Sequence, residues 1–166
     1  MIIAVDVHYR DDLARSASVE FEDWSADEAN KIHIVDIDEV AEYIPGQFYK
    51  RELPCILEVL KHSDLNKVKA IVIDGYVILN NDGKHGLGAY LYEALENKIP
   101  IIGVAKNHFH NNDKFVCEVY RGQSQKPLYV TSMGIQPDLA AQYIKQMKGD
   151  YRIPELLKLV DQIGRE

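Results

Sequence analysis

Two short apolar runs limit the folds open to this chain more than any other feature of its sequence. Residues 69–74 (KAIVID) and 100–105 (PIIGVA) consist mostly of branched apolar residues, as expected for strands that are buried on both faces. A glycine-containing loop, residues 80–88, and a helical segment, residues 89–96, separate them. Strands that are joined through a helix pair in parallel, with a right-handed crossover. The centre of the sheet is therefore predicted to be parallel.

The first part of the chain predicts a different kind of pairing. Residues 2–7 (IIAVDV) indicate a short buried strand, whereas residues 17–21 and 32–37 alternate with period two, which is typical of half-exposed strands. Polar turns join the three segments, so we expect an antiparallel meander. The later elements are predicted from the same signals: a linker over 38–46, helices over 51–62, 137–147 and 154–163, and strands over 115–120 and 128–131.

This order of elements indicates an α/β fold. Its mixed sheet has three antiparallel strands followed by parallel strands, with helices on its faces, and this is the layout of the ribonuclease H-like fold. With 166 residues and 46% hydrophobic content, the chain is long enough for one well-buried core, and we expect a single domain over residues 1–166.

Other features restrict the compartment and the partners. No apolar run approaches the roughly 18 residues needed to cross a bilayer, so no membrane partner is expected. The chain starts without a signal-peptide pattern, and Cys55 and Cys117 lie far apart with no metal-type spacing. We therefore expect a reduced, cytoplasmic protein.

The net charge of −7 argues against a polyanionic partner, but the acids are unevenly distributed. Residues 1–45 hold twelve acids and three Lys or Arg, whereas the remaining 121 residues have a net charge of +2. A polyanion can approach that later part, particularly where a divalent cation neutralises carboxylates. Charge alone leaves the partner open.

Asp6 and Asp74 are the leading candidates for a functional site. Each comes near the end of a predicted strand, and the two strands are expected to be adjacent and parallel, so both carboxylates lie at the edge where open α/β sheets bind ligands. Two neighbouring carboxylates repel unless a cation lies between them, and Mg²⁺ binds one or two carboxylates together with waters and phosphate oxygens. Taken singly, each acid is ordinary at a strand end. Only the predicted pairing favours a metal site.

Five further residues have both an ordinary and a functional interpretation. Glu52 lies in the first turn of its helix, where a carboxylate favours the helix dipole, and Lys106 closes a strand, where it is solvated or faces a scissile phosphate. His8 points to the same side as Asp6 if the strand continues. His108 and His110 alternate in an extended segment, and solvent exposure is preferred over a metal pair.

Seven segments also match the motifs of one known family, in order and in rough spacing. They are IAVDVHY (3–9), YIPGQFYKRELP (43–54), IVIDGYVIL (71–79), GLGAYL (86–91), IPIIGVAK (99–106), KPLYVTSMG (126–134) and YRIPELLKLVD (151–161). Together they resemble endonuclease V, the metal-dependent nuclease that acts near deoxyinosine. The resemblance covers most of the chain.

The resemblance implies a catalytic site. Asp6 and Asp74 would bind Mg²⁺, with Mn²⁺ as an alternative ion, while Glu52 would orient the attacking water and Lys106 would neutralise developing charge. The reaction implied is hydrolysis of a phosphodiester bond in DNA one nucleotide 3′ of deoxyinosine, as a step of DNA repair.

The resemblance also implies a nucleic-acid interface. A wedge would separate the duplex at the lesion, and backbone groups would read the flipped base. The wedge residues implied are Tyr43, Ile44, Pro45 and Gly46, and the base-reading positions are Gly75 and the edge that starts at Gly103.

Two positions depart from the family pattern. The family has histidines where this chain has Asn80 and Ile135, and Asp138 is a candidate replacement for the second. Two alternatives therefore stay open: a nucleic-acid-binding relative with weak or no catalysis, and a ribonuclease that acts on inosine in RNA. The oligomeric state is not predicted.

Overall fold

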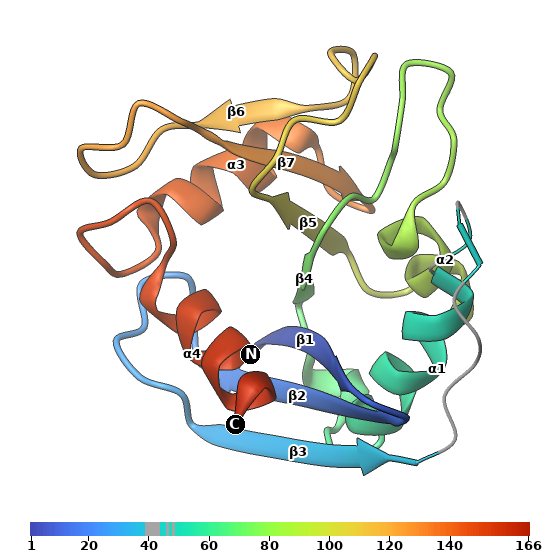
Figure 1. Cartoon of the computed structure of the whole chain (residues 1–166). Coiled ribbons are helices and arrows are strands. Elements are labelled where there is room, and N and C mark those ends of the chain that lie inside the picture. Colours follow the sequence, from blue (N-terminus) through green and yellow to red (C-terminus); the bar gives the residue numbers. More distant parts are fainter. Residues whose placement is uncertain (39–43, 46, 48) are drawn as a thin grey trace.

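A mixed sheet forms the centre of the protein, and over the described residues it has seven strands (Figure 1). The structure is a computed structural model and describes residues 1–166 except 39–43, 46 and 48. The strands are β1 (Ile2–Arg10), β2 (Leu13–Phe21), β3 (Lys31–Ile37), β4 (Ala70–Asp74), β5 (Ile101–Ala105), β6 (Cys117–Val119) and β7 (Leu128–Met133). They lie in the order β3-β2-β1-β4-β5-β7-β6.

The pairing confirms the predicted arrangement. β1, β2 and β3 form an antiparallel meander, and β1, β4 and β5 pair in parallel. β7 then pairs antiparallel with both β5 and β6. The prediction for β1 and β2 was too short, because the polar residues near their turn, such as Arg15 and Ser16, pair on both sides with neighbouring strands.

Four helices cover the sheet, with the predicted positions correct to within two residues at each end. They are α1 (Tyr49–Leu60), α2 (Leu87–Ala94), α3 (Pro137–Gln146) and α4 (Glu155–Arg165), and a short 3₁₀ turn, η1, spans Leu65–Lys67. In Figure 1, α1 and α2 lie on one face of the sheet and α3 and α4 on the other. None of the described helices is long and apolar enough to cross a membrane.

The alternation of β1 decides which face its polar residues point to. Ile3 and Val5 pack into the core on the α1 and α2 side, whereas Ile2 and Ala4 pack into the core on the α3 and α4 side. Asp6 and His8 continue the second series, so they point toward α4.

Candidate active site

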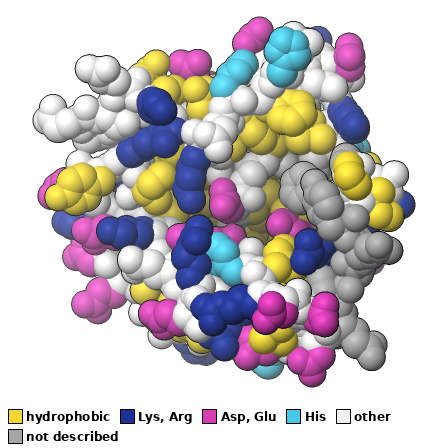
Figure 2. Space-filling view, in the orientation of Figure 1, with side chains coloured by type: hydrophobic (Ala, Val, Ile, Leu, Met, Phe, Trp, Pro, Cys, Tyr) yellow, Lys and Arg dark blue, Asp and Glu magenta, His cyan; other side chains and the backbone are white. Residues whose placement is uncertain are grey.

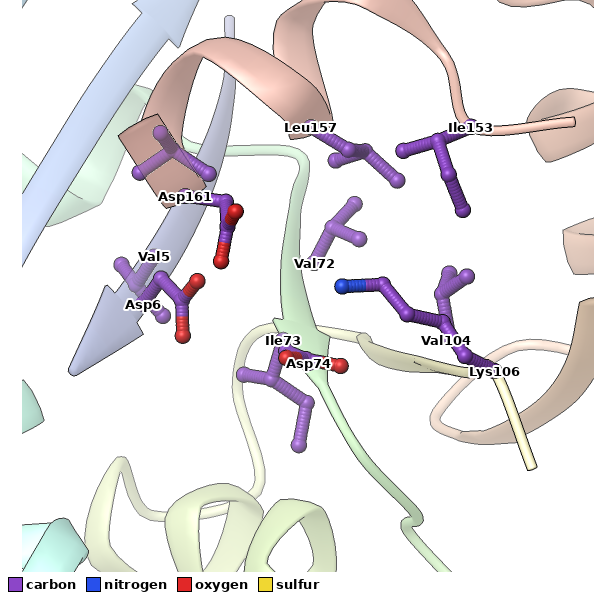
Figure 3. A pocket seen from close by; sticks show the side chains of 11 residues that line it. Val5, Asp6, Val72, Ile73, Asp74, Val104, Lys106, Ile153, Leu157 and Asp161 are labelled. Carbon is purple, nitrogen blue, oxygen red and sulfur yellow. The ribbon is translucent and has the colours of Figure 1, made fainter. Parts of the chain in front are cut away.

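The parallel register brings Asp6 and Asp74 together at one edge of the sheet. Val5 and Ile73 are partners on β1 and β4, so Asp6 and Asp74 occupy the next, neighbouring positions. Asp74 is in turn the partner of Val104 on β5, and Lys106 follows two residues later on the same side. Figure 3 shows the three side chains around one pocket, with the Lys106 amine directed inward.

Helix α4 adds a third carboxylate, Asp161, to this pocket (Figure 3). Its Oδ1 atom lies 3.1 Å from His8 Nε2, which lies 3.3 Å from Asp6 Oδ2. Sequence reasoning missed this residue as a site residue, although it ends one of the family-like segments. One signal was present: Asp161 follows Leu157 by one turn and Val160 directly, so it is an acid beside the apolar face of its helix.

The rest of the pocket wall is apolar. The pocket contains about 370 Å³ of empty space, part of it open to solvent, and Figure 3 shows Ile153 and Leu157 above the charged groups. Val72 and Val104 line its floor from the sheet. Apolar walls lower the local dielectric constant, so the charges in the pocket interact more strongly than they would in water.

Glu52 approaches the same carboxylates from the start of α1. Partial burial, followed by the negative charges of Asp6 and Asp74, raises its pKa from 4.5 to about 7, while Arg51 and His8 act in the opposite direction. Glu52 thus lies close enough to Asp6 and Asp74 for their charges to raise its pKa. A carboxyl group with a pKa of about 7 is suited to accept a proton near neutral pH.

The pKa values of Asp74 and His8 are raised, whereas the pKa of Asp161 is lowered. Asp74 is exposed as a residue but lies in a concave surface, where desolvation and then the charge of Asp6 raise its pKa against the effect of Lys106. The pKa of His8 is raised mainly because its ring nitrogen faces Asp6, while burial opposes the change. For Asp161, burial acts to raise the pKa, but Arg165 and Lys106 outweigh it and the pKa is lowered.

The donor set is suited to a divalent cation. Asp6, His8 and Asp161 each offer one ligand atom that lies within 4.8 Å of the other two. His8 Nε2 and Asp161 Oδ1 are buried and have no hydrogen-bond partner among the described residues. Buried polar atoms of this kind are unfavourable unless something binds them, and a cation between them would do so. Asp74, the other predicted ligand, lies next to this group.

The family model for endonuclease V matches residues 1–162. The chain belongs to the endonuclease V family. It is therefore a member of a nuclease family, and the resemblance to endonuclease V is confirmed.

Solved structures of the family share the fold. Endonuclease V from Streptomyces avermitilis is 25% identical, with a TM-score of 0.82, over 99% of this chain and 79% of that chain. The catalytic domain of human endonuclease V is 19% identical, with a TM-score of 0.78, over 99% and 80%. Endonuclease V from Ciona intestinalis, in complex with DNA containing an inosine followed by a ribo-adenosine, is 19% identical, with a TM-score of 0.79, over 99% and 83%.

A more distant match places the fold in a wider group. Argonaute from Marinitoga piezophila is 10% identical, with a TM-score of 0.57, over 99% of this chain and 29% of that chain. Together with the strand order, these neighbours confirm the ribonuclease H-like mixed sheet. No curated protein matched the sequence.

The structure describes part of the predicted wedge, residues 43–46. Tyr43 and Gly46 lie outside the described residues. Ile44 and Pro45 are exposed, and Ile44 retains 47% of its accessible surface, which is a high fraction for a large apolar side chain.

The two glycines that were predicted to read a base have different environments. Gly75 has a φ of 130°, which favours glycine, and its N–H donates to the Val104 carbonyl at 3.1 Å. Gly103 is buried, and a Cβ atom there would lie 2.4 Å from the Gly75 carbonyl oxygen. The chain after β4 covers Gly103, and a contact between this position and a base stays a prediction. Gly103 permits this close crossing and acts through packing.

The two departures from the endonuclease V pattern are structural residues. Asn80 Oδ1 accepts hydrogen bonds from two backbone N–H groups of its own loop, and Ile135 packs against the core on the α3 and α4 side. Asp138 is exposed in the first turn of α3 and does not line the pocket, so the replacement that we considered is not formed. His108 and His110 are exposed, as expected.

Proposed function

We propose that this protein is a divalent-metal-dependent endonuclease that hydrolyses a phosphodiester bond of DNA one nucleotide 3′ of deoxyinosine. The observation that carries the proposal is the meeting of Asp6, Glu52, Asp74 and Asp161 with Lys106 at one edge of the sheet, in a chain of the endonuclease V family. The complex of the Ciona intestinalis relative with inosine-containing DNA supports the class of substrate. DNA repair is the process in which such a cut would serve.

Each residue of the site has a defined task in this proposal. Asp6 and Asp74 would hold Mg²⁺, or Mn²⁺ in its place, and the bound ion would supply charge neutralisation and Lewis acidity at the phosphate. Glu52 accepts a proton from the attacking water, for which a pKa of about 7 is suitable. The Lys106 ammonium group stabilises negative charge that develops on the phosphate oxygens.

The surface around the pocket is compatible with a nucleic-acid backbone. Figure 2 shows acidic side chains and a histidine in the middle of this face, with Lys and Arg side chains close beside them. The exposed Ile44 and Pro45 supply an apolar edge of the kind that separates stacked bases, at a cost of a few kcal/mol for each step.

Nicking of a deoxyinosine-containing duplex in Mg²⁺ tests the proposal. We expect the wild type to cut the duplex, Asp74→Asn to cut at least about 100-fold more slowly, and Asp27→Asn, at an exposed position that does not line the pocket, to cut normally. Equal nicking by the wild type and Asp74→Asn would remove Asp74 from the mechanism. Tight duplex binding without any nicking by the wild type would establish instead the non-catalytic, nucleic-acid-binding alternative.

Cleavage of inosine-containing RNA is a second candidate activity. The inosine in the Ciona intestinalis complex is followed by a ribonucleotide, which favours testing both sugars. Comparison of kcat/KM for matched DNA and RNA strands decides which is preferred. A reducing cytoplasm is the proposed location, since Cys55 and Cys117 are both free thiols.

A further inference from the structure

His8 is placed between two carboxylates by elements that are far apart in the chain. Asp6 and His8 lie two residues apart on β1 and so point to the same side, where α4 supplies Asp161. His8 Nε2 lies 3.3 Å from Asp6 Oδ2 and 3.1 Å from Asp161 Oδ1. Two ligand atoms that each lie about 2.1 Å from one ion, at about 90° to each other, are about 3.0 Å apart. The observed spacing therefore fits neighbouring ligands of one metal ion, and it also fits a histidine paired with two carboxylates.

Each carboxylate is already oriented by a second contact. Asp6 Oδ1 accepts the Val7 N–H at 2.9 Å, and Asp161 Oδ2 accepts from Arg165 Nε at 3.0 Å. The remaining oxygen of each group, Asp6 Oδ2 or Asp161 Oδ1, faces His8. Hydrogen bonds of this kind hold metal ligands in place and are a regular part of metal sites.

Gly164 shows that α4 makes room for the imidazole ring. A Cβ atom at Gly164 would lie 2.4 Å from His8 Cδ2, so the ring occupies the space that any other residue would fill. Gly164 lies on the same side of α4 as Asp161, three residues after it.

The imidazole of His8 differs from the two carboxylates in the metal ions that it binds well, so it affects which ion the site prefers. Mg²⁺ prefers oxygen ligands and gives up its waters reluctantly, whereas imidazole nitrogen is a good ligand for transition metals. We propose that His8 Nε2 is a direct metal ligand together with Asp6 and Asp161, and that it makes this site select Mn²⁺ over Mg²⁺. The inference deepens the proposed function, from which it takes only the presence of a divalent ion beside Asp6.

Metal binding by the full chain, without nucleic acid, tests this inference. Isothermal titration with Mn²⁺ and with Mg²⁺ compares the wild type, His8→Ala and the control His62→Ala, which removes an exposed histidine. We expect His8→Ala to weaken Mn²⁺ binding at least about tenfold and Mg²⁺ binding much less, while His62→Ala changes neither. Equal losses for the two ions, or no loss of Mn²⁺ binding, would overturn the selectivity.

Pulsed electron paramagnetic resonance of bound Mn²⁺ gives an answer that does not depend on the stability of any variant. A directly bound imidazole produces a nitrogen coupling, which is expected in the wild type and in His62→Ala and should vanish in His8→Ala. Its absence from the wild type would show that His8 is only an ion-pair partner of the two aspartates. Neither experiment uses turnover. A protein that fails to cut DNA can therefore still show His8 as a metal ligand, and a protein in which His8 does not bind metal can still cut DNA.

Discussion

Replacing Glu52 with glutamine is expected to stabilise the metal-free protein at neutral pH. Glu52 lies near Asp6 and Asp74, and burial together with their charges raises its pKa from 4.5 to about 7. The folded protein therefore binds the Glu52 proton more tightly than the unfolded chain does. As the pH rises from about 4.5 to about 7, the unfolded chain releases this proton first, so the free energy of unfolding of the wild type falls.

The size of the effect follows from the same pKa. Each pKa unit corresponds to about 1.4 kcal/mol, so a rise from 4.5 to about 7 corresponds to about 3 kcal/mol. Glutamine does not titrate. The advantage of Glu52→Gln should be close to zero at about pH 4.5, about 1.4 kcal/mol at about pH 5.5, and about 3 kcal/mol above about pH 7.

Urea unfolding in the presence of a chelator, at about pH 4.5 and about pH 8, measures this difference. Glu58→Gln is the matched control, because Glu58 lies exposed on the same helix and pairs only with Lys61, at 2.7 Å, so its change should stay below about 1 kcal/mol at both pH values. Saturating Mg²⁺ should reduce the advantage of Glu52→Gln, because a nearby cation favours ionised carboxylates. A gain that is equal at both pH values, or no gain at all, would refute the argument that burial and the two neighbouring aspartates disfavour the ionised form of Glu52.

Three further predictions concern packing and catalysis. Gly103→Ala should lower the free energy of unfolding by about 1–3 kcal/mol in a urea titration, because its Cβ would lie 2.4 Å from the Gly75 carbonyl oxygen; an unchanged midpoint would contradict this contact. Arg121→Met should lower the free energy of unfolding by about 3 kcal/mol or more, because buried Arg121 donates hydrogen bonds to five carbonyl oxygens near the loop between α3 and α4. An unchanged Tm in calorimetry would disprove that role. Lys106→Met should slow single-turnover nicking at least about 100-fold without weakening Mg²⁺ binding, and a loss of metal binding in its place would argue against a role at the phosphate.

The sequence by itself determined the elements and the parallel centre of the sheet. Branched apolar runs, period-two alternation and proline in the first turn of a helix are local signals, and they placed the helices to within two residues. The neighbourhood of Asp6 and Asp74 also followed from the sequence, because parallel strands joined by a helix must end at the same edge. Glu52 and Lys106 were candidates from their positions in the sequence, their catalytic roles came from the family resemblance, and the structure brings both to this edge.

Only the tertiary structure shows that Asp161 is the third carboxylate of the pocket and that His8 lies between Asp6 and Asp161. Whether Asp161 reaches Asp6 depends on how α4 crosses the sheet, and that angle results from side-chain packing between segments about 150 residues apart. The same holds for Gly164, whose missing side chain has a purpose only when His8 lies against it. The burial of Gly103 has a similar origin, because the segment that crosses it follows another strand, β4. Local sequence patterns carry no information on such crossings, so the residues that complete the site emerge only from the packed structure.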